Sequence, residues 1–461
     1  MARSNIQLAE RPEKFDKSLL DPPWNSCSIE GTNGGNLKSL RNSPFITNVV
    51  KLAGGSAIGQ ALVMLSMPLV TRLYSPADMG IFGVFMSFIS FASVGVALRY
   101  DLAIVAARDK FEADVLLITS IALAVPCVFI ASFVLFGMIR FNILGYGLLP
   151  DWSALAMLVA LLATGVFSSL RLWYVGRQKF GEISMALVSQ GAGRAILPVI
   201  LGWLSSGWTG MLGGEILGRL LGVVRLARGA WPEARITFAT LDSKDGVNVL
   251  RRYWKYPAVF LPSSMIDALA TSLPLPIISS LYGVGAAGQY FLVARLASVP
   301  AALISAGVAD VFHAKIAETA RTDKSLVHRT LKSAIQKLTV VSLGIYLPVA
   351  LISPFVFSIV FGESWQQAGT LMAIQSLACI TGLVVSPLSR ALAISRYPEL
   401  KFLPDIVRLV APVSSLWVCH YFGMTFLLTM VVFAVLTAIS EIFYMSIIWY
   451  ATADHRQLSY H

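Results

Sequence analysis

The sequence predicts an all-α polytopic membrane protein of about 12 transmembrane helices in two six-helix bundles, related by a parallel pseudo-twofold repeat. Composition is the first reason: 56% of the 461 residues are hydrophobic and 13% are charged, against roughly 25% charged in soluble chains. Too few polar side chains remain to cover a soluble fold of this length. The apolar segments and the distribution of basic residues lead to the same fold class.

Twelve apolar segments are long enough to cross a bilayer, which takes about 20 helical residues. A longer polar gap after the sixth segment divides them into two sets of six. The predicted spans are 46–70, 80–98, 113–139, 153–175, 184–204, 211–229, 256–281, 288–309, 335–357, 370–393, 402–420 and 425–450.

Basic residues set the predicted orientation. The net charge is +11, and most Lys and Arg residues fall in the N-terminal tail and in connections on the same side of the membrane. Only Arg72 and Arg140 are placed in connections on the other side. Because Lys and Arg concentrate in cytoplasmic segments of membrane proteins, we expect both termini in the cytoplasm. The positive charge therefore indicates topology, and no nucleic-acid partner is expected.

The polar gap is the expected boundary between two halves. The first residues contain no apolar core of signal-peptide length, so they are expected to form a tail. The expected domains are a disordered cytoplasmic tail (1–43), an N-terminal six-helix bundle (44–229), a cytoplasmic connecting loop (230–255), a C-terminal six-helix bundle (256–450) and a second cytoplasmic tail (451–461).

An internal repeat supports the two halves. The stretch "PLVTRLYSPADMGIF", which begins at Pro68, has a faint copy 208 positions later, "PIISSLYGVGAAGQYF". Each copy joins the first two spans of its half on the same side, which indicates a parallel repeat; chance similarity is the alternative. Residues 75–78, "SPAD", have the form of a capping box that begins the second span. Arg72 and Tyr74 suit the membrane interface.

Charged residues within the spans are the candidate functional residues, because a charge at the bilayer centre costs at least ~2.5–3.5 kcal/mol. Glu215 and Arg219 are one helical turn apart and can pair, beside glycines at GxxxG spacing that allow close helix contact. A packing ion pair and a water-filled cavity are equally open for these two. Arg194 and Arg295 have no partner at helical spacing, which favours a cavity.

Charges nearer the span ends have simpler explanations. Arg171 and Arg390 can extend to the interface. Asp405 and Arg408, one turn apart, can form a local pair.

The intramembrane charges predict an anionic, phosphate-bearing ligand. Arg presents a planar fork that matches phosphate oxygens, so Arg194, Arg219 and Arg295 are the predicted substrate-binding residues. The predicted counter-charges are Glu215, Asp267 and Glu441, and one of these acids is a candidate site for a coupling H⁺ or Na⁺. No GxxxxGK[ST] loop is present, so no built-in ATPase is expected. Neither a cofactor, a metal site nor a catalytic residue is expected.

Several stretches, through their order and combination, carry a family resemblance. The first three are "GGSAIGQALVMLSMPLVTRLYSPADMGIFGVF", "LRYDLAIVAARDKFEA" and "YWKYPAVFLPSSMIDALATSLPLPIISSLYGVGAAGQYFLVARLASVPAAL". Together with "VFGESWQQAG" and "SPLSRALAISRYPEL", they resemble the bacterial polysaccharide flippase family of the multidrug/oligosaccharidyl-lipid/polysaccharide exporter superfamily. The resemblance covers about 44–450. It implies two six-helix bundles around a central basic cavity, and only Arg295, within "ARLASVP", is carried over as a basic cavity position.

The resemblance further implies a transporter of the inner membrane, not an enzyme. Its substrate would be a polyprenyl-diphosphate-linked oligosaccharide repeat unit for O-antigen, capsule or exopolysaccharide. The implied partners are this lipid-linked oligosaccharide, inner-membrane lipids, a glycan polymerase and a chain-length regulator.

Three alternatives stay open. A multidrug or other small-solute exporter belongs to the same superfamily, but the excess of Arg within spans disfavours cationic drugs. A membrane glycan polymerase or ligase is an enzyme, and the sequence lacks the sizeable outer loop that such an enzyme normally needs. A flippase for lipid-linked peptidoglycan precursors is the third, although that class often has additional spans.

Overall fold

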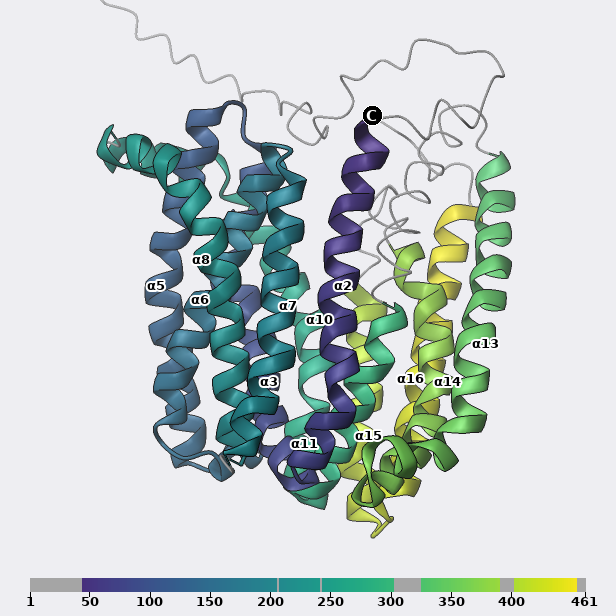
Figure 1. Ribbon diagram of the computed structural model, residues 1–461. Helices are drawn as coiled ribbons and strands as arrows, with labels where there is room; N and C mark the ends of the chain where they lie inside the picture. The colour runs from purple at the N-terminus through teal and green to yellow at the C-terminus, as the bar shows by residue number, and fades with distance from the viewer. Residues whose placement is uncertain (1–43, 205–206, 241–242, 302–324, 390–401, 454–461) are drawn as a thin grey trace, which may run out of the picture.

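The computed structural model describes residues 44–204, 207–240, 243–301, 325–389 and 402–453. The predicted tails fall outside these ranges, apart from the first residues of the second. Within the described ranges the chain is α-helical without a β-strand (Figure 1). Among the described residues, ten helices are long and apolar enough to cross a membrane. The predicted spans 211–229 and 288–309 are not among the ten. The first lies on the long helix α8, and the second is described only as far as residue 301, where the helical residues 284–301 end.

The first half contains α2 (Pro44–Leu73), α3 (Pro76–Gly95), α4 (Tyr100–Ala103), η3 (Ile104–Ala106), α5 (Lys110–Arg140), η4 (Ile143–Leu148), α6 (Ser153–Gly176), α7 (Phe180–Trp203) and α8 (Trp208–Thr240). The connecting segment contains α9 (Ser243–Arg252). The second half contains η5 (Tyr256–Phe260), α10 (Leu261–Ser272), α11 (Pro274–Tyr282), residues 284–301, α13 (Ser325–Phe361), η6 (Glu363–Trp365), α14 (Gln366–Leu388), α15 (Phe402–Tyr421) and α16 (Phe426–Ala453).

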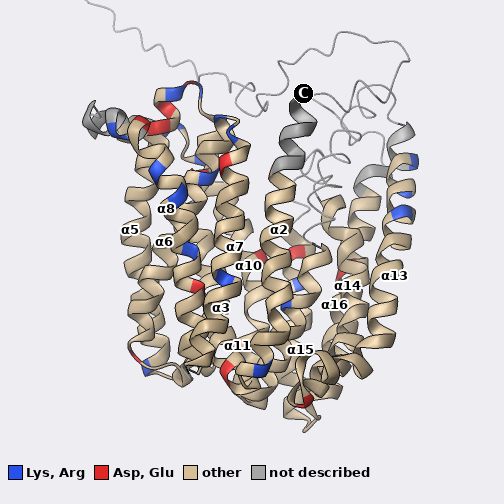
Figure 2. Ribbon diagram, in the orientation of Figure 1, with Lys and Arg blue, Asp and Glu red and all other residues tan. Residues whose placement is uncertain are grey.

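The long helices run between two ends of the molecule (Figure 1). We call the end at which Pro44 and Ala453 lie the terminal end. The opposite end, called the distal end, carries the short connections 74–75 and 422–425 and the turns η4 and η6. Figure 2 shows that Lys, Arg, Asp and Glu gather at the terminal end of the first half and that a few lie deep within the helices.

The two halves share one hydrophobic core at the distal end and have separate cores at the terminal end. The shared core joins Phe82 and Tyr74 of the first half to Ile277 and Trp365 of the second. A second core lies in the first half around Trp173, and a third lies wholly within the second half. Among the described residues, the hydrophobic core that joins the halves therefore lies at the distal end.

The repeated motif lies on the boundary between the halves at the distal end. A Cβ atom added to Gly80 would lie 3.1 Å from the Gly288 nitrogen, and one added to Gly288 would lie 3.0 Å from the Gly80 nitrogen. Two equivalent positions thus contact each other reciprocally, as they do across a twofold axis. The Trp365 Nε1 also donates to the Thr71 carbonyl at 2.9 Å.

The capping box is confirmed, but the interfacial role of Tyr74 is wrong. Ser75 Oγ accepts from the Asp78 backbone N–H at 3.1 Å, and Asp78 accepts from the Ser75 N–H in return. Tyr74 is 3% exposed and donates to the Pro198 carbonyl at 2.7 Å. A buried phenol needs such a partner, and α7 supplies it inside the bundle.

The connecting segment predicted as a loop is largely helical where it is described. α8 continues to Thr240, and α9 follows. Arg252 Nη1 lies 2.6 Å from Glu112 Oε1, and the Tyr253 hydroxyl donates to Glu112 Oε2 at 3.1 Å. These contacts attach the end of the connecting segment to α5, so that it packs as part of the first half.

Candidate functional site

Three of the predicted residues meet inside the first half. Glu215 on α8 accepts from Arg194 Nε at 2.8 Å and from Arg219 Nε at 3.0 Å, one arginine on each carboxylate oxygen. The Glu215 side chain is 3% exposed. Arg219 also donates to the Thr164 hydroxyl on α6. We call Arg194, Glu215 and Arg219 the triad.

Close packing of α7 against α8 brings the triad together. A Cβ on Gly218 would lie 2.5 Å from Arg194 Cγ, and a Cβ on Gly214 would lie 2.5 Å from Pro198 Cγ. Neither position has room for a larger residue. The GxxxG spacing therefore does what was predicted: the small residues let the two helices approach until Arg194 reaches Glu215.

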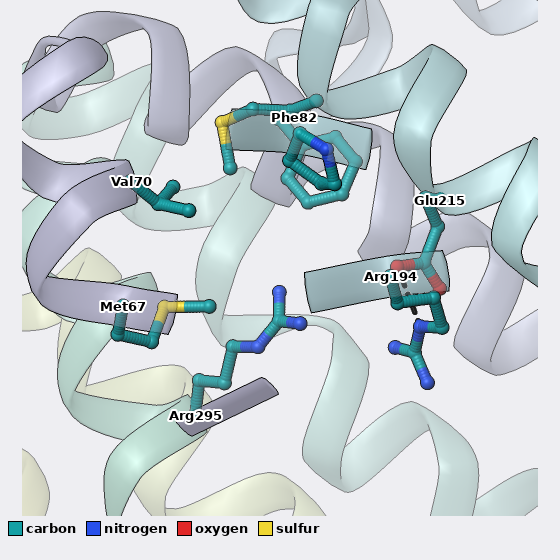
Figure 3. Close-up of a pocket in the computed structure, with 8 residues that line it drawn as sticks. Met67, Val70, Phe82, Arg194, Glu215 and Arg295 are labelled. Atoms are coloured by element: carbon teal, nitrogen blue, oxygen red, sulfur yellow. Dashed lines mark hydrogen bonds and ion pairs between the residues drawn. The ribbon is translucent and has the colours of Figure 1, made fainter. Parts of the chain in front are cut away.

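Arg295 faces the triad from the second half. It lies on helical residues 284–301 and lines one small space with Arg194, Glu215 and apolar side chains of the first half (Figure 3). Its guanidinium is 5.9 Å from the Phe291 ring centroid. Among the described residues, Arg295 has no hydrogen-bond or ion-pair partner for its guanidinium. Three guanidinium groups thus surround one carboxylate, which leaves the site net positive.

The space between these side chains is closed in this conformation. Its volume is about 10 Å³, which is room for roughly one water molecule. Met67, Val70, Phe82 and Met211 fill the rest of its wall. A phosphate-bearing ligand can reach the three arginines only after the halves move apart.

A second cavity, of about 160 Å³, lies in the other half. Asp267 on α10, Asp405 on α15 and Glu441 on α16 line it together with Arg408 and Tyr444. Arg408 Nε lies 2.9 Å from Glu441 Oε1. The Tyr444 side chain is 2% exposed, and its hydroxyl has no hydrogen-bond partner among the described residues. Three carboxylates face one guanidinium here, so this cavity has the opposite charge.

The candidate residues therefore fall into two groups. Arg194, Arg219, Arg295 and Glu215 line or adjoin the basic space, whereas Asp267 and Glu441 line the acidic cavity. The local Asp405–Arg408 pair stays a prediction, and the structure shows Arg408 in an ion pair with Glu441 on the neighbouring helix.

Helix pairing explains what the sequence could not predict. The partner of Arg194 was missed because Glu215 is on another helix, and helical spacing reveals partners on the same helix only. Thr164 was missed for the same reason. Arg390 lies outside the described residues.

The comparisons with known proteins agree with this architecture. The family model of a polysaccharide biosynthesis protein matches residues 69–370, more than half of the chain. The chain belongs to this family. No curated protein sequence matches it. The family and the helical membrane fold are those of a membrane exporter or flippase, as the sequence predicted.

Solved structures of the MOP superfamily share the fold. An inward-facing multidrug resistance MATE family transporter has a TM-score of 0.62 at 15% identity, over 89% of this chain and 99% of that chain. A MOP superfamily transporter from Pyrococcus furiosus, described as having a binding pocket of reversed polarity, has a TM-score of 0.56 at 15% identity, over 93% and 100%. At this identity the likeness concerns the fold alone.

Proposed function

We propose that this polysaccharide biosynthesis protein is a flippase that moves polyprenyl-diphosphate-linked oligosaccharide repeat units across the bacterial inner membrane. The observation that carries this proposal is the position of Arg295, unpaired among the described residues, opposite the triad at the boundary between the halves. Arg guanidinium groups match phosphate oxygens in geometry and stay charged. The substrate diphosphate would bind Arg194, Arg219 and Arg295.

The glycan creates the physical problem that such a protein solves. Each hydroxyl buried without a hydrogen bond costs roughly 2–7 kcal/mol, and a diphosphate costs more. A water-filled path between the two halves keeps the sugar hydrated, while the polyprenyl chain stays in lipid. Glycan and diphosphate therefore cross inside the protein, and the apolar chain crosses outside it.

Alternating access follows from the way the halves are joined. The shared core closes the distal end, whereas the terminal end has two separate cores. The distribution of basic residues supports a cytoplasmic terminal end, with both termini there. The described conformation would then precede loading, and the substrate would bind when the halves separate from the terminal end.

The acidic cavity supports a coupling role. Asp267 and Glu441 lie on candidate membrane-spanning helices of the second half, where a charge has a high free-energy cost. They line a cavity large enough for several water molecules. We propose that this cavity takes up H⁺ or Na⁺, and that occupancy changes the packing of α10 against α15. Glu215 serves instead as the counter-charge of the basic site.

Polymer export in cells tests the proposal. A strain that lacks its own oligosaccharide flippase would carry the wild-type chain, Arg295→Ala or Arg329→Ala, which changes an exposed arginine of α13. We expect surface polymer from the wild type and Arg329→Ala and little from Arg295→Ala at equal membrane abundance. Full export by Arg295→Ala would contradict the proposal.

The two other functions predict different results. A multidrug exporter would protect cells against cationic drugs without restoring polymer, and the three arginines disfavour this outcome. A glycan polymerase or ligase would extend or transfer glycan on one side of the membrane. In that case purified protein would change the length of the glycan, whereas a flippase leaves it unchanged.

A further inference from the structure

Polar side chains follow one face of α6 from the triad towards the terminal end. Thr164, Ser168 and Arg171 are spaced at i, i+4 and i+7, so they share a helix face. Thr164 accepts from Arg219 of the triad. Ser168 donates to Asp101 Oδ2 at 2.8 Å, and Asp101 interacts electrostatically with Arg171. At 1.5 Å of rise per residue, Arg171 lies about 10 Å from Thr164 along the helix.

Burial changes along this face of α6. At the distal end Met157 and Ala160, on the same face, are both 0% exposed. At the terminal end of that face Arg171 is exposed. The opposite face shows the reverse order: Leu155 is 70% exposed at the distal end, and Trp173 is 1% exposed near the terminal end. The polar face is therefore covered at the distal end, where Met157 and Ala160 belong to the shared core, and exposed at Arg171 near the terminal end.

Arg171 has capacity for a ligand. Among the described residues its guanidinium makes no hydrogen bond or ion pair within bonding distance, and the nearby carboxylate of Asp101 is already engaged by Ser168. A charged side chain on a membrane-spanning helix faces water or a partner, because its transfer into lipid costs too much free energy. Since Arg171 is exposed on the face that leads to the triad, its five N–H donors are free for an anion.

We propose that Arg171 is a second anion-binding site, at which the diphosphate of the substrate docks before it reaches the triad. This proposal rests on the proposed flippase function, and it assigns to Arg171 a role beyond simple extension to the interface. The polar hydroxyls of Ser168 and Thr164 lie between the two sites. The substrate would thus pass from one arginine site to the next along α6.

Cysteine labelling tests the docking site. The full chain, with native cysteines replaced and Arg171 retained, would carry Ser168→Cys, one turn from Arg171 on the same face, or Met185→Cys in inverted membrane vesicles. Met185 is the matched control because it lies on α7 near the same end of the molecule and is exposed. An anionic, membrane-impermeant thiol reagent would be added with or without a polyprenyl diphosphate.

The expected result is labelling at position 168, slowed at least about fivefold by the polyprenyl diphosphate bound at Arg171, with no protection at position 185. Equal protection at the two positions, or protection at neither, would overturn the docking site. Binding of the same diphosphate is measured in parallel: we expect Arg171→Gln to weaken it about tenfold and Arg171→Lys to restore most of it.

Failure of the docking site and failure of the flippase function are distinguishable. If Arg171→Gln binds the diphosphate like the wild type while Arg295→Ala does not, the docking site is wrong and the proposed function stands. If neither variant changes binding, both proposals are wrong.

Discussion

Gly80 and Gly288 pack directly against each other across the boundary between the two halves. Each lies against the backbone of the other, and the carbonyls of Pro76 and Val284 occupy the places where side chains would project. Because the two positions are equivalent in the internal repeat, one motif supplies both sides of the contact. Glycine on both sides lets two helices meet at backbone distance, and the distal end closes there.

A side chain at this contact should disturb closure. We expect Gly288→Ala to cost roughly 1–3 kcal/mol of packing free energy in the closed state and to reduce transport several-fold. Gly285→Ala is the control, because a Cβ at Gly285 meets no atom within 4 Å. Transport rates in proteoliposomes measure the effect, and equal rates for the two variants would contradict this account of the closure.

Removal of Glu215 should destabilise the first half. Glu215→Ala leaves Arg194 and Arg219 without their carboxylate, and loss of one partner from a buried ion pair costs about 3–5 kcal/mol. Glu182→Ala is the control, since Glu182 lies 3.9 Å from Arg225 in an exposed pair worth about 0–1 kcal/mol. Thermal unfolding in detergent measures both, and an equal loss of stability in the two variants would argue against the triad.

Tyr253 should make folding sensitive to alkaline pH. Burial, followed by the nearby Glu112 carboxylate, raises the pKa of Tyr253 above its ordinary value of 10.0. The folded state therefore keeps a proton that the unfolded state releases, and this contribution to stability is present below pH 10 and is lost as pH rises towards the higher folded-state pKa. Between pH 9 and about 12, Tyr253→Phe should lose less stability than the wild type. The exposed Tyr421→Phe should follow the wild type.

The acidic cavity should couple transport to an ion. We expect Asp267→Asn to remove most of the response of transport to an imposed H⁺ or Na⁺ gradient, while binding of the diphosphate in the other half stays within about twofold of the wild type. Arg408→Ala should disturb the same response by leaving Glu441 unpaired. A gradient response that survives Asp267→Asn would place the coupling ion elsewhere.

The sequence predicted the fold class well because membrane spans are set by length and apolarity, which are local properties. The capping box at Ser75 and the helix contact at Gly214 and Gly218 were predictable for the same reason: each depends on spacing within one short segment. The repeat was recognisable through Tyr74 and Gly80, although the burial of Tyr74 depends on a helix more than a hundred residues away.

The candidate site was only partly predictable. Intramembrane charges identified Arg194, Glu215 and Arg295, but their arrangement depends on which helices pack together. The pairing of Arg408 with Glu441 is set by the contact of α15 with α16. Nor could the sequence indicate that a polar face of α6 leads from the triad to an exposed Arg171, because that follows from the contact of Thr164 with Arg219 on another helix and from burial along α6.

The flipping rate of a polyprenyl-diphosphate-linked oligosaccharide tests the central claim most directly. Purified wild type, Arg295→Ala, Arg295→Lys and the control Arg329→Ala would be reconstituted in liposomes, with the glycan detected as it becomes accessible on the opposite side. We expect Arg295→Ala to lower the rate at least tenfold, Arg295→Lys to restore part of it, and Arg329→Ala to match the wild type. A wild-type rate in Arg295→Ala, or no flipping by the wild-type protein itself, would contradict the account.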